Sequence, residues 1–211
     1  MATQTQTPTG AEQHLNVEQQ VQKLRALYAD APELGKVAFE HVFPALQSEL
    51  AARTEAASSQ SAGRIGIREG DVSELTMIAP ITEAGAKRLR GLLQMLAGKF
   101  RGADLVGTVH DMRFVFLDND TKLLFATAYD GDWDPYIDDF ATKIPDYLDL
   151  LFCDAVGWPG IRSPKVKDYL VDHQIAAEGW YVAHPDATVA ETARLKHVGK
   201  AVDEFLDKVG S

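Results

Sequence analysis

The chain has 211 residues, of which 45% are hydrophobic and 25% charged, the composition of an ordinary globular protein with one domain and an extension. Its formal net charge of −10 disfavours nucleic acid and membrane lipid as partners, because both attract basic surfaces. The single cysteine, Cys153, excludes an intrachain disulfide and favours a reducing cytoplasm. No segment approaches the roughly 18 apolar residues of a membrane-spanning helix, and the first residues do not resemble a secretory signal.

The N-terminal part of the chain is predicted to be a tail followed by helices. The first ten residues, MATQTQTPTG, are rich in Thr, Gln and Pro, which favours disorder. The next stretch carries apolar residues at helical spacing, and the small polar run SSQSAG then predicts a linker. We therefore expect a disordered tail over 1–10, a helical extension with its linker over 11–63, and an α+β domain over 64–211.

The α+β domain alternates strand and helix patterns. Strands are predicted over 74–81, 108–117, 122–129 and 179–183, with a hairpin turn at 118–120. Helices are predicted to follow Thr82 and to cover 135–152, 166–173 and 188–209, with Pro145 disturbing the second of them. This order predicts a ferredoxin-like fold, in which helices cover one face of an antiparallel four-stranded sheet.

The second face of the predicted sheet also carries apolar side chains. In the strand 108–117, residues such as Phe114 alternate with residues such as Val115, so both faces are apolar in part. A sheet with one face in water should alternate more cleanly. We expect a second copy of the chain to cover this face, which predicts a homodimer; the N-terminal helices are the alternative cover.

Four stretches of the domain resemble a poorly characterised bacterial family. They are TVHDMRFVFLD, KLLFATAYDGDWDPYIDDF, DAVGWPG and VDHQIAAEGWYVAHPDATV, and together they span roughly residues 73–200. The resemblance implies a ferredoxin-like protein of the dimeric α/β barrel type, and it makes haem a possible cofactor, because members are sometimes associated with haem peroxidases. The sequence departs from the family pattern at Asp111, Met112, Asp132 and Asp134.

Five aspartates lie in the stretch TAYDGDWDPYIDDF, residues 127–140. A calcium loop of the EF-hand type needs Gly at its sixth position and Glu at its twelfth, but counting from Asp130 these are Pro135 and Ala141. Capping of the helix that begins near Pro135 is favoured over a cation site or catalytic carboxylates. The histidines lack the spacing of a zinc site, so we predict no metal ligands.

The candidate catalytic residues are His110, Arg113 and Tyr129. His110 would supply a ligand or a proton, Arg113 an anion contact, and Tyr129 a hydroxyl or a radical-capable ring. His110 and His197, the latter on the terminal helix, are the candidate haem ligands. Alternation places His110 and Arg113 on opposite sides of their strand unless a β-bulge intervenes. The simpler interpretation of His110 is a core or interface histidine with one hydrogen-bond partner.

Two functions from different classes follow from these patterns. The first is a small-molecule or haem-binding, oxidoreductase-like protein associated with peroxidases. The second is a non-catalytic homodimeric accessory module, in which the motif residues only maintain the hairpin, the turn and the cap. A saturable spectral shift on adding hemin would distinguish them, because an accessory module binds no haem.

Overall fold

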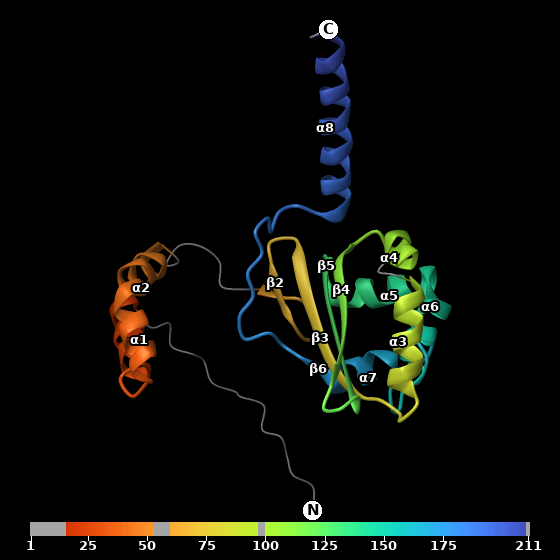
Figure 1. Ribbon diagram of the computed structural model, residues 1–211, viewed down its shortest axis with the longest axis horizontal. Helices are drawn as coiled ribbons and strands as arrows, with labels where there is room; N and C mark the ends of the chain where they lie inside the picture. The colour runs from red at the N-terminus through yellow and green to blue at the C-terminus, as the bar shows by residue number, and fades with distance from the viewer. Residues whose placement is uncertain (1–15, 53–59, 97–99, 210–211) are drawn as a thin grey trace, which may run out of the picture. The chain divides into compact units, whose positions relative to one another are not determined.

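The computed structural model of this chain describes residues 16–52, 60–96 and 100–209. The chain divides into two compact units, Met1–Ser58 and Ser59–Ser211. Figure 1 labels the helices and strands of each unit. The predicted tail over 1–10 lies outside the described residues. Residues 60 and 61, expected in the linker, instead form a short strand.

The N-terminal unit contains two helices, α1 (Val17–Leu27) and α2 (Glu33–Ala52). A capping box starts α1: the side chain of Asn16 accepts from the Gln19 backbone N–H at 2.8 Å, and the Gln19 side chain accepts from the Asn16 N–H at 3.0 Å. Val21, Phe39 and Phe43 form the small core between the helices. The helical periodicity predicted both helices, and α2 continues through Pro44.

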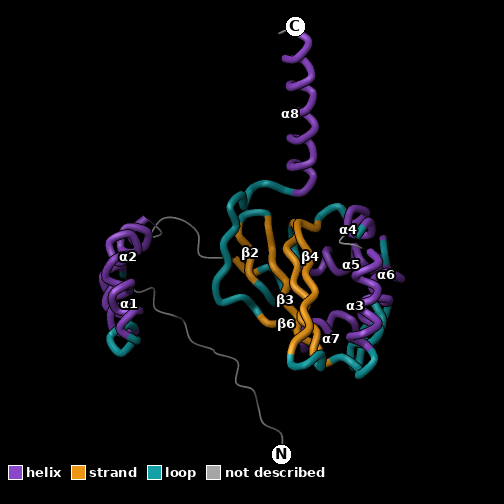
Figure 2. The backbone as a smooth tube through the Cα atoms, viewed as in Figure 1, coloured by secondary structure: helices purple, strands orange, loops and turns teal. Residues whose placement is uncertain are grey.

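The second unit is built on one antiparallel sheet. Its strands are β1 (Gln60–Ser61), β2 (Ile67–Glu69), β3 (Val72–Pro80), β4 (Val109–Leu117), β5 (Lys122–Asp130) and β6 (Gln174–Ile175). They pair in the order β1-β2-β3-β5-β4, and β6 pairs with β3 as well. Figure 2 shows β2, β3, β4 and β6 of this sheet in orange. The hairpin between β4 and β5 confirms the predicted turn, because Asp118, Asn119 and Asp120 all adopt positive φ, which Asn and Asp tolerate better than most residues.

The predicted strand over 179–183 is wrong, because these residues form a loop. The chain leaves the sheet directly after β6. At that point the backbone N–H of Ala177 donates to Oε1 of Glu74, a side chain, at 3.2 Å, rather than to a neighbouring strand. The fourth strand of the predicted sheet is therefore reduced to the two residues of β6.

The helices of this unit are α3 (Gly85–Leu96), α4 (Arg101–Val106), α5 (Trp133–Lys143), α6 (Pro145–Phe152), α7 (Val166–His173) and α8 (Val189–Val209). The main core lies between one face of the sheet and helices α3, α5, α6 and α7 (Figure 1). The single helix predicted over 135–152 is two helices, because Pro145 has no backbone N–H to continue α5 and instead starts α6.

The terminal helix α8 was predicted correctly but packs differently from the other helices. None of its residues is buried, although it carries several large apolar side chains. No helix among the described residues is long and apolar enough to cross a membrane.

The second face of the sheet is closed in part by the chain itself. The segment between β6 and α8 is fastened to the start of β3 by the Ala177–Glu74 hydrogen bond and by the Asp71 N–H, which donates to the Pro185 carbonyl at 2.8 Å. Other apolar side chains of this face stay open, and Val115 is 45% exposed. The predicted homodimer through sheet faces remains a prediction.

Candidate functional site

His110 lies in a β-bulge at the start of β4. Val109 pairs with Tyr129 and Asp111 with the next residue of β5, Ala128, so His110 is the extra residue between them. Val109 packs against the core, as Met112 does further along the strand. The bulge thus changes the alternation that the sequence suggested, and it turns His110 away from the core toward the face that carries Asp111 and Arg113.

The partner of His110 is Asp130, the last residue of β5. Nε2 of His110 lies 2.6 Å from Oδ1 of Asp130; the His110 side chain is 26% exposed and the Asp130 side chain 12%. The second carboxylate oxygen of Asp130 accepts from the backbone N–H of Val189, the first residue of α8, at 2.9 Å. This pair resembles the orienting half of an acid–base site, but it also ties β4, β5 and α8 together.

Arg113 and Tyr129 do not join His110 in one site. The Arg113 guanidinium is exposed and lies 3.4 Å from Asp111 on the same strand. Tyr129 is fully buried in the core, on the opposite face of the sheet, and its ring stacks on Tyr136 at a centroid distance of 3.7 Å. The three candidate catalytic residues therefore sit in three different environments.

The Tyr129 hydroxyl is buried without a hydrogen-bond partner in the described part of the chain. Burial raises the pKa of Tyr129 far above its ordinary value, and the nearby charge of Glu74 adds to the effect. A proton that is held this tightly is poorly suited to acid–base exchange at neutral pH. The geometry favours a packing role for this ring.

His197, the second candidate haem ligand, lies on α8 and is exposed to solvent. It does not face the sheet, because no residue of α8 is buried. Its separation from the core leaves it without the enclosed, apolar surroundings that a haem pocket provides.

The five aspartates are each engaged with a donor rather than gathered around a cation. Lys167 bridges Asp134 and Asp138 at 2.9 and 2.8 Å, which relieves the repulsion expected between two acids one turn apart. Hydrogen bonds from Lys167 and Arg64 hold the pKa of Asp134 below its ordinary value. Asp132 occupies the N-cap position of α5, but its side chain pairs with Arg68 and makes no capping hydrogen bond. The described residues contain no cluster of potential metal ligands.

Two polar residues fix this end of the domain, and one of them, Glu74, was not singled out from the sequence. Glu74 is 4% exposed and accepts from the backbone of Ile67 and Ala177 and from the Thr76 hydroxyl. Gln174 accepts from the indole N–H of Trp133 at 2.8 Å. A carboxylate within a mostly apolar strand was the available signal for Glu74, because such a residue is rarely buried without several donors.

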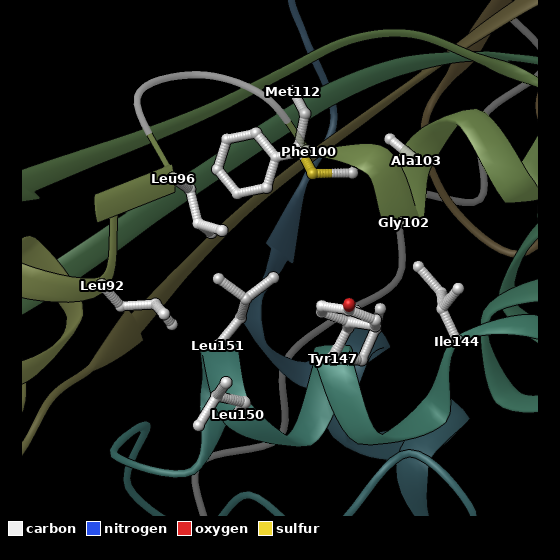
Figure 3. A pocket seen from close by; sticks show the side chains of 11 residues that line it. Leu92, Leu96, Phe100, Gly102, Ala103, Met112, Ile144, Tyr147, Leu150 and Leu151 are labelled. Carbon is white, nitrogen blue, oxygen red and sulfur yellow. The ribbon is translucent and has the colours of Figure 1, made fainter. Parts of the chain in front are cut away.

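An apolar cavity of about 160 Å³ lies between α3, α4, β4 and α6; we call it the α3–α6 cavity. Figure 3 shows Leu96, Phe100 and Met112 on one side and Ile144, Tyr147 and Leu151 on the other. Its remaining lining residues are Leu92, Gly102, Ala103, Leu148 and Leu150. Among all these side chains Tyr147 alone carries a hydroxyl, and that residue is half exposed, as is Leu150. The sequence predicted the helix after Thr82 that carries Leu92 and Leu96, but not the space beside it.

A more open groove continues from this cavity along α3. The two share Leu92 and Leu150, and the groove ends at Arg88 and Asp154. Arg88 donates two hydrogen bonds to the Asp154 carboxylate, at 2.7 and 2.8 Å, and Thr82 donates a third at 2.9 Å. The Thr82 hydroxyl thus donates to Asp154, and this contact joins the start of α3 to the end of α6.

The residues of the cavity do not fit haem. A cavity of about 150 Å³ accommodates benzene, so a porphyrin with its four pyrrole rings is far larger than the space between α3 and α6. The lining contains no histidine, and His110 and His197 lie elsewhere.

No protein-family model, curated protein or solved structure matches this chain. The resemblance of its motif stretches to a bacterial family therefore stays a prediction.

Proposed function

We propose that the protein binds one small, largely apolar molecule in the α3–α6 cavity, of the size of a substituted benzene ring. The observation that carries this proposal is the combination of about 160 Å³ of space with a lining of aliphatic and aromatic side chains. A cavity of about this size lined by Leu, Ile and Phe takes up benzene, because an apolar ligand suits such a lining better than water does.

The lining also indicates the chemical class of the ligand. The Phe100 ring and the Met112 thioether favour an aromatic ring, since sulfur–aromatic and ring–ring contacts are both attractive. The half-exposed Tyr147 offers a hydroxyl to a single polar substituent. A phenol or a similar monosubstituted ring meets both conditions, whereas a charged or highly polar molecule would lose its hydration without compensation.

This proposal keeps the small-molecule part of the expected function and replaces haem by an apolar ligand.

For the fold we propose the ferredoxin-like arrangement. It is supported by β5 lying between β3 and β4, as in a split βαβ unit, and by β6 pairing with the other edge of β3. We also propose that the protein is a homodimer and that it is located in the reducing cytoplasm. The single cysteine supports this location.

The proposal is tested by titrating phenol and toluene into the isotope-labelled full chain and following backbone amide shifts by NMR. We expect saturable shifts confined to residues around the cavity, such as Ala103, Met112 and Leu151. Ala103→Leu places a larger side chain in the space and should weaken binding at least tenfold. Gly102→Ala should weaken it less, because a Cβ there would lie 3.4 Å from Ile144 and 3.7 Å from Tyr147.

A matched control is Gly91→Ala in α3, where a Cβ would meet no atom within 4 Å. Both glycine changes raise helix propensity, so only the loss of space distinguishes them. Equal affinities in Gly102→Ala, Gly91→Ala and the parent chain, or shifts that spread away from the cavity, would contradict the proposal. A saturable hemin spectrum that is lost in His110→Ala or His197→Ala would support the haem interpretation instead.

The second candidate is the non-catalytic accessory module, and the roles of the motif residues support it. Three motif residues are buried, and their polar side-chain atoms form hydrogen bonds within the domain: Trp133, Tyr136 and Gln174. If phenol and toluene cause no saturable shifts while the chain forms a defined dimer, this module becomes the better description.

A further inference from the structure

The groove that continues from the α3–α6 cavity has a volume of about 580 Å³, and we call it the α3 groove. Most of its lining residues recur at helical spacing and share one face of α3: Ala84, Lys87, Arg88, Gly91, Leu92 and Met95. Leu92 and Leu150 line both the groove and the cavity. In Figure 3 these two residues lie at the end of the cavity away from Gly102 and Ile144. A ligand held in the cavity can therefore extend past Leu92 into the groove.

Gly91 keeps the middle of the α3 groove open. A Cβ at this position would meet no atom within 4 Å, so the packing of α3 does not require a glycine there. Glycine inside a helix is also less favourable than alanine. On either side of this open position the lining is apolar, and Met95 is 86% exposed. An open path between apolar side chains suits an alkyl chain that lies along α3.

The far end of the groove carries an excess of positive charge. Lys87 and Arg88 line it together with one carboxylate, that of Asp154, although the whole chain has a net charge of −10. Arg88 donates to Asp154 through Nε and Nη2 and is otherwise exposed. Lys87 is exposed too, and no carboxylate within the described ranges pairs with it. One further negative charge on a ligand would therefore balance the charges of the lining.

We propose that the α3–α6 cavity and the α3 groove together bind an arylalkyl carboxylate, an inference that rests on the proposed binding of an aromatic ring in the cavity. The ring occupies the cavity, a short alkyl chain lies over Gly91, and the carboxylate pairs with Lys87 beside Arg88. The length is suitable, because Arg88 precedes Leu92 by about one helical turn, roughly 5 to 6 Å along the axis. The carboxylate stays in the open groove and keeps part of its hydration.

The first test compares four ligands in NMR titrations of the full chain: toluene, phenylbutyrate, its neutral amide phenylbutanamide, and benzoate. Phenylbutyrate should shift the amides of both Gly91 and Met112, because it spans the groove and the cavity. It should bind roughly tenfold more tightly than toluene, since each methylene removed from water adds up to about fourfold in affinity. It should also bind about threefold more tightly than the amide, as expected of an exposed ion pair. Benzoate should bind more weakly than toluene, because its carboxylate would enter the cavity.

The second test uses two variants that separate the groove from the cavity. Lys87→Met should abolish the preference for phenylbutyrate over its amide. Gly91→Leu should weaken both of these long ligands, because the new side chain fills the groove, and it raises helix propensity. Neither residue lines the cavity, so toluene should bind both variants as it binds the parent chain. Lys196→Met on α8 removes the same charge outside the groove and should leave all four affinities unchanged.

Saturable toluene binding combined with equal affinities for phenylbutyrate and its amide would overturn the carboxylate inference and leave the cavity proposal intact. A Lys87→Met chain that keeps the preference for phenylbutyrate would do the same. Phenylbutyrate shifts confined to the groove would also overturn the inference, because the ring would then lie outside the cavity. If neither toluene nor the long ligands bind, both the cavity proposal and this inference are wrong.

Discussion

His110 and Asp130 form a hydrogen bond of 2.6 Å between the bulge of β4 and the end of β5. Because Asp130 also accepts from the first backbone N–H of α8, one carboxylate joins three elements of the domain. His110, a candidate catalytic residue and haem ligand from the sequence, is thus the partner of an aspartate that anchors the domain.

Asp130→Ala should lower the free energy of unfolding by about 1 to 3 kcal/mol, because it leaves His110 and the Val189 N–H without their acceptor. Hydrogen exchange at the Val189 amide should accelerate at the same time. The control is Asp132→Ala, whose side chain is exposed and pairs with Arg68, so its cost should stay below about 1 kcal/mol. Equal losses in the two variants, measured by urea denaturation, would contradict the anchoring role.

Tyr129→Phe should change the free energy of unfolding little, because among the described residues only the Ser73 hydroxyl lies near the buried hydroxyl that is removed, and it makes no well-formed hydrogen bond to it. Tyr136→Phe provides the comparison, since the Tyr136 hydroxyl lies 2.9 Å from the Thr127 hydroxyl. That variant should lose about 1 kcal/mol. A larger loss at Tyr129 than at Tyr136 in thermal unfolding would mean that the Tyr129 hydroxyl has a partner or a function.

Asp154 should make the domain sensitive to acid. Hydrogen bonds from Arg88 and Thr82 lower the pKa of Asp154 to about 2, from an ordinary value of 3.8. A lowered folded-state pKa stabilises the protein above about pH 4, and that stabilisation is lost as the pH falls toward 2. We expect Asp154→Asn to cost about 1 to 2 kcal/mol at neutral pH and progressively less between pH 4 and 2.

The measurement is chemical denaturation of both chains across this pH range. Asp146→Asn is a suitable control, because Asp146 pairs with Arg162 on the surface and should change the free energy of unfolding little at any pH. A difference between Asp154→Asn and the parent chain that does not shrink below pH 4 would argue against the assigned cause.

Lys167→Met should raise the pKa of Asp134 toward its ordinary value, because the Lys167 hydrogen bond is the largest cause of the lowered pKa. Arg64→Met should raise it less, because Arg64 is the second contributor. Carboxyl carbon shifts in an NMR titration report the pKa directly. The reverse order of the two effects would show that Arg64, and not Lys167, neutralises this end of α5.

Local patterns predicted most of the elements, and long-range contacts account for the differences. Pro145 marked a disturbance, but the sequence did not show whether the helix would bend or divide. The segment 179–183 was expected to be a strand because it has aromatic and β-branched residues. It forms a loop instead, and just before it the Ala177 N–H donates to the buried Glu74 side chain and not to a neighbouring strand. Such a contact between residues a hundred positions apart leaves no periodic signal.

The candidate site was less predictable than the fold, for a similar reason. The bulge at His110 reverses the alternation that had separated it from Arg113, and a bulge depends on pairing with another strand. Tyr129 and Trp133 carried strong motif signals because they fill the core. The α3–α6 cavity is a property of the space between side chains, which no residue pattern encodes.

Because β4 is an edge strand of the sheet, Arg113 and Asp111 also help to protect that edge. An outermost strand offers unpaired backbone groups to any extended chain that it meets, and natural sheets discourage such additions with charged side chains and bulges. β4 has both devices: the bulge at His110 and the Arg113–Asp111 pair beside it. Replacing the two charged residues by threonine would preserve the strand and make the protein prone to edge-to-edge aggregation.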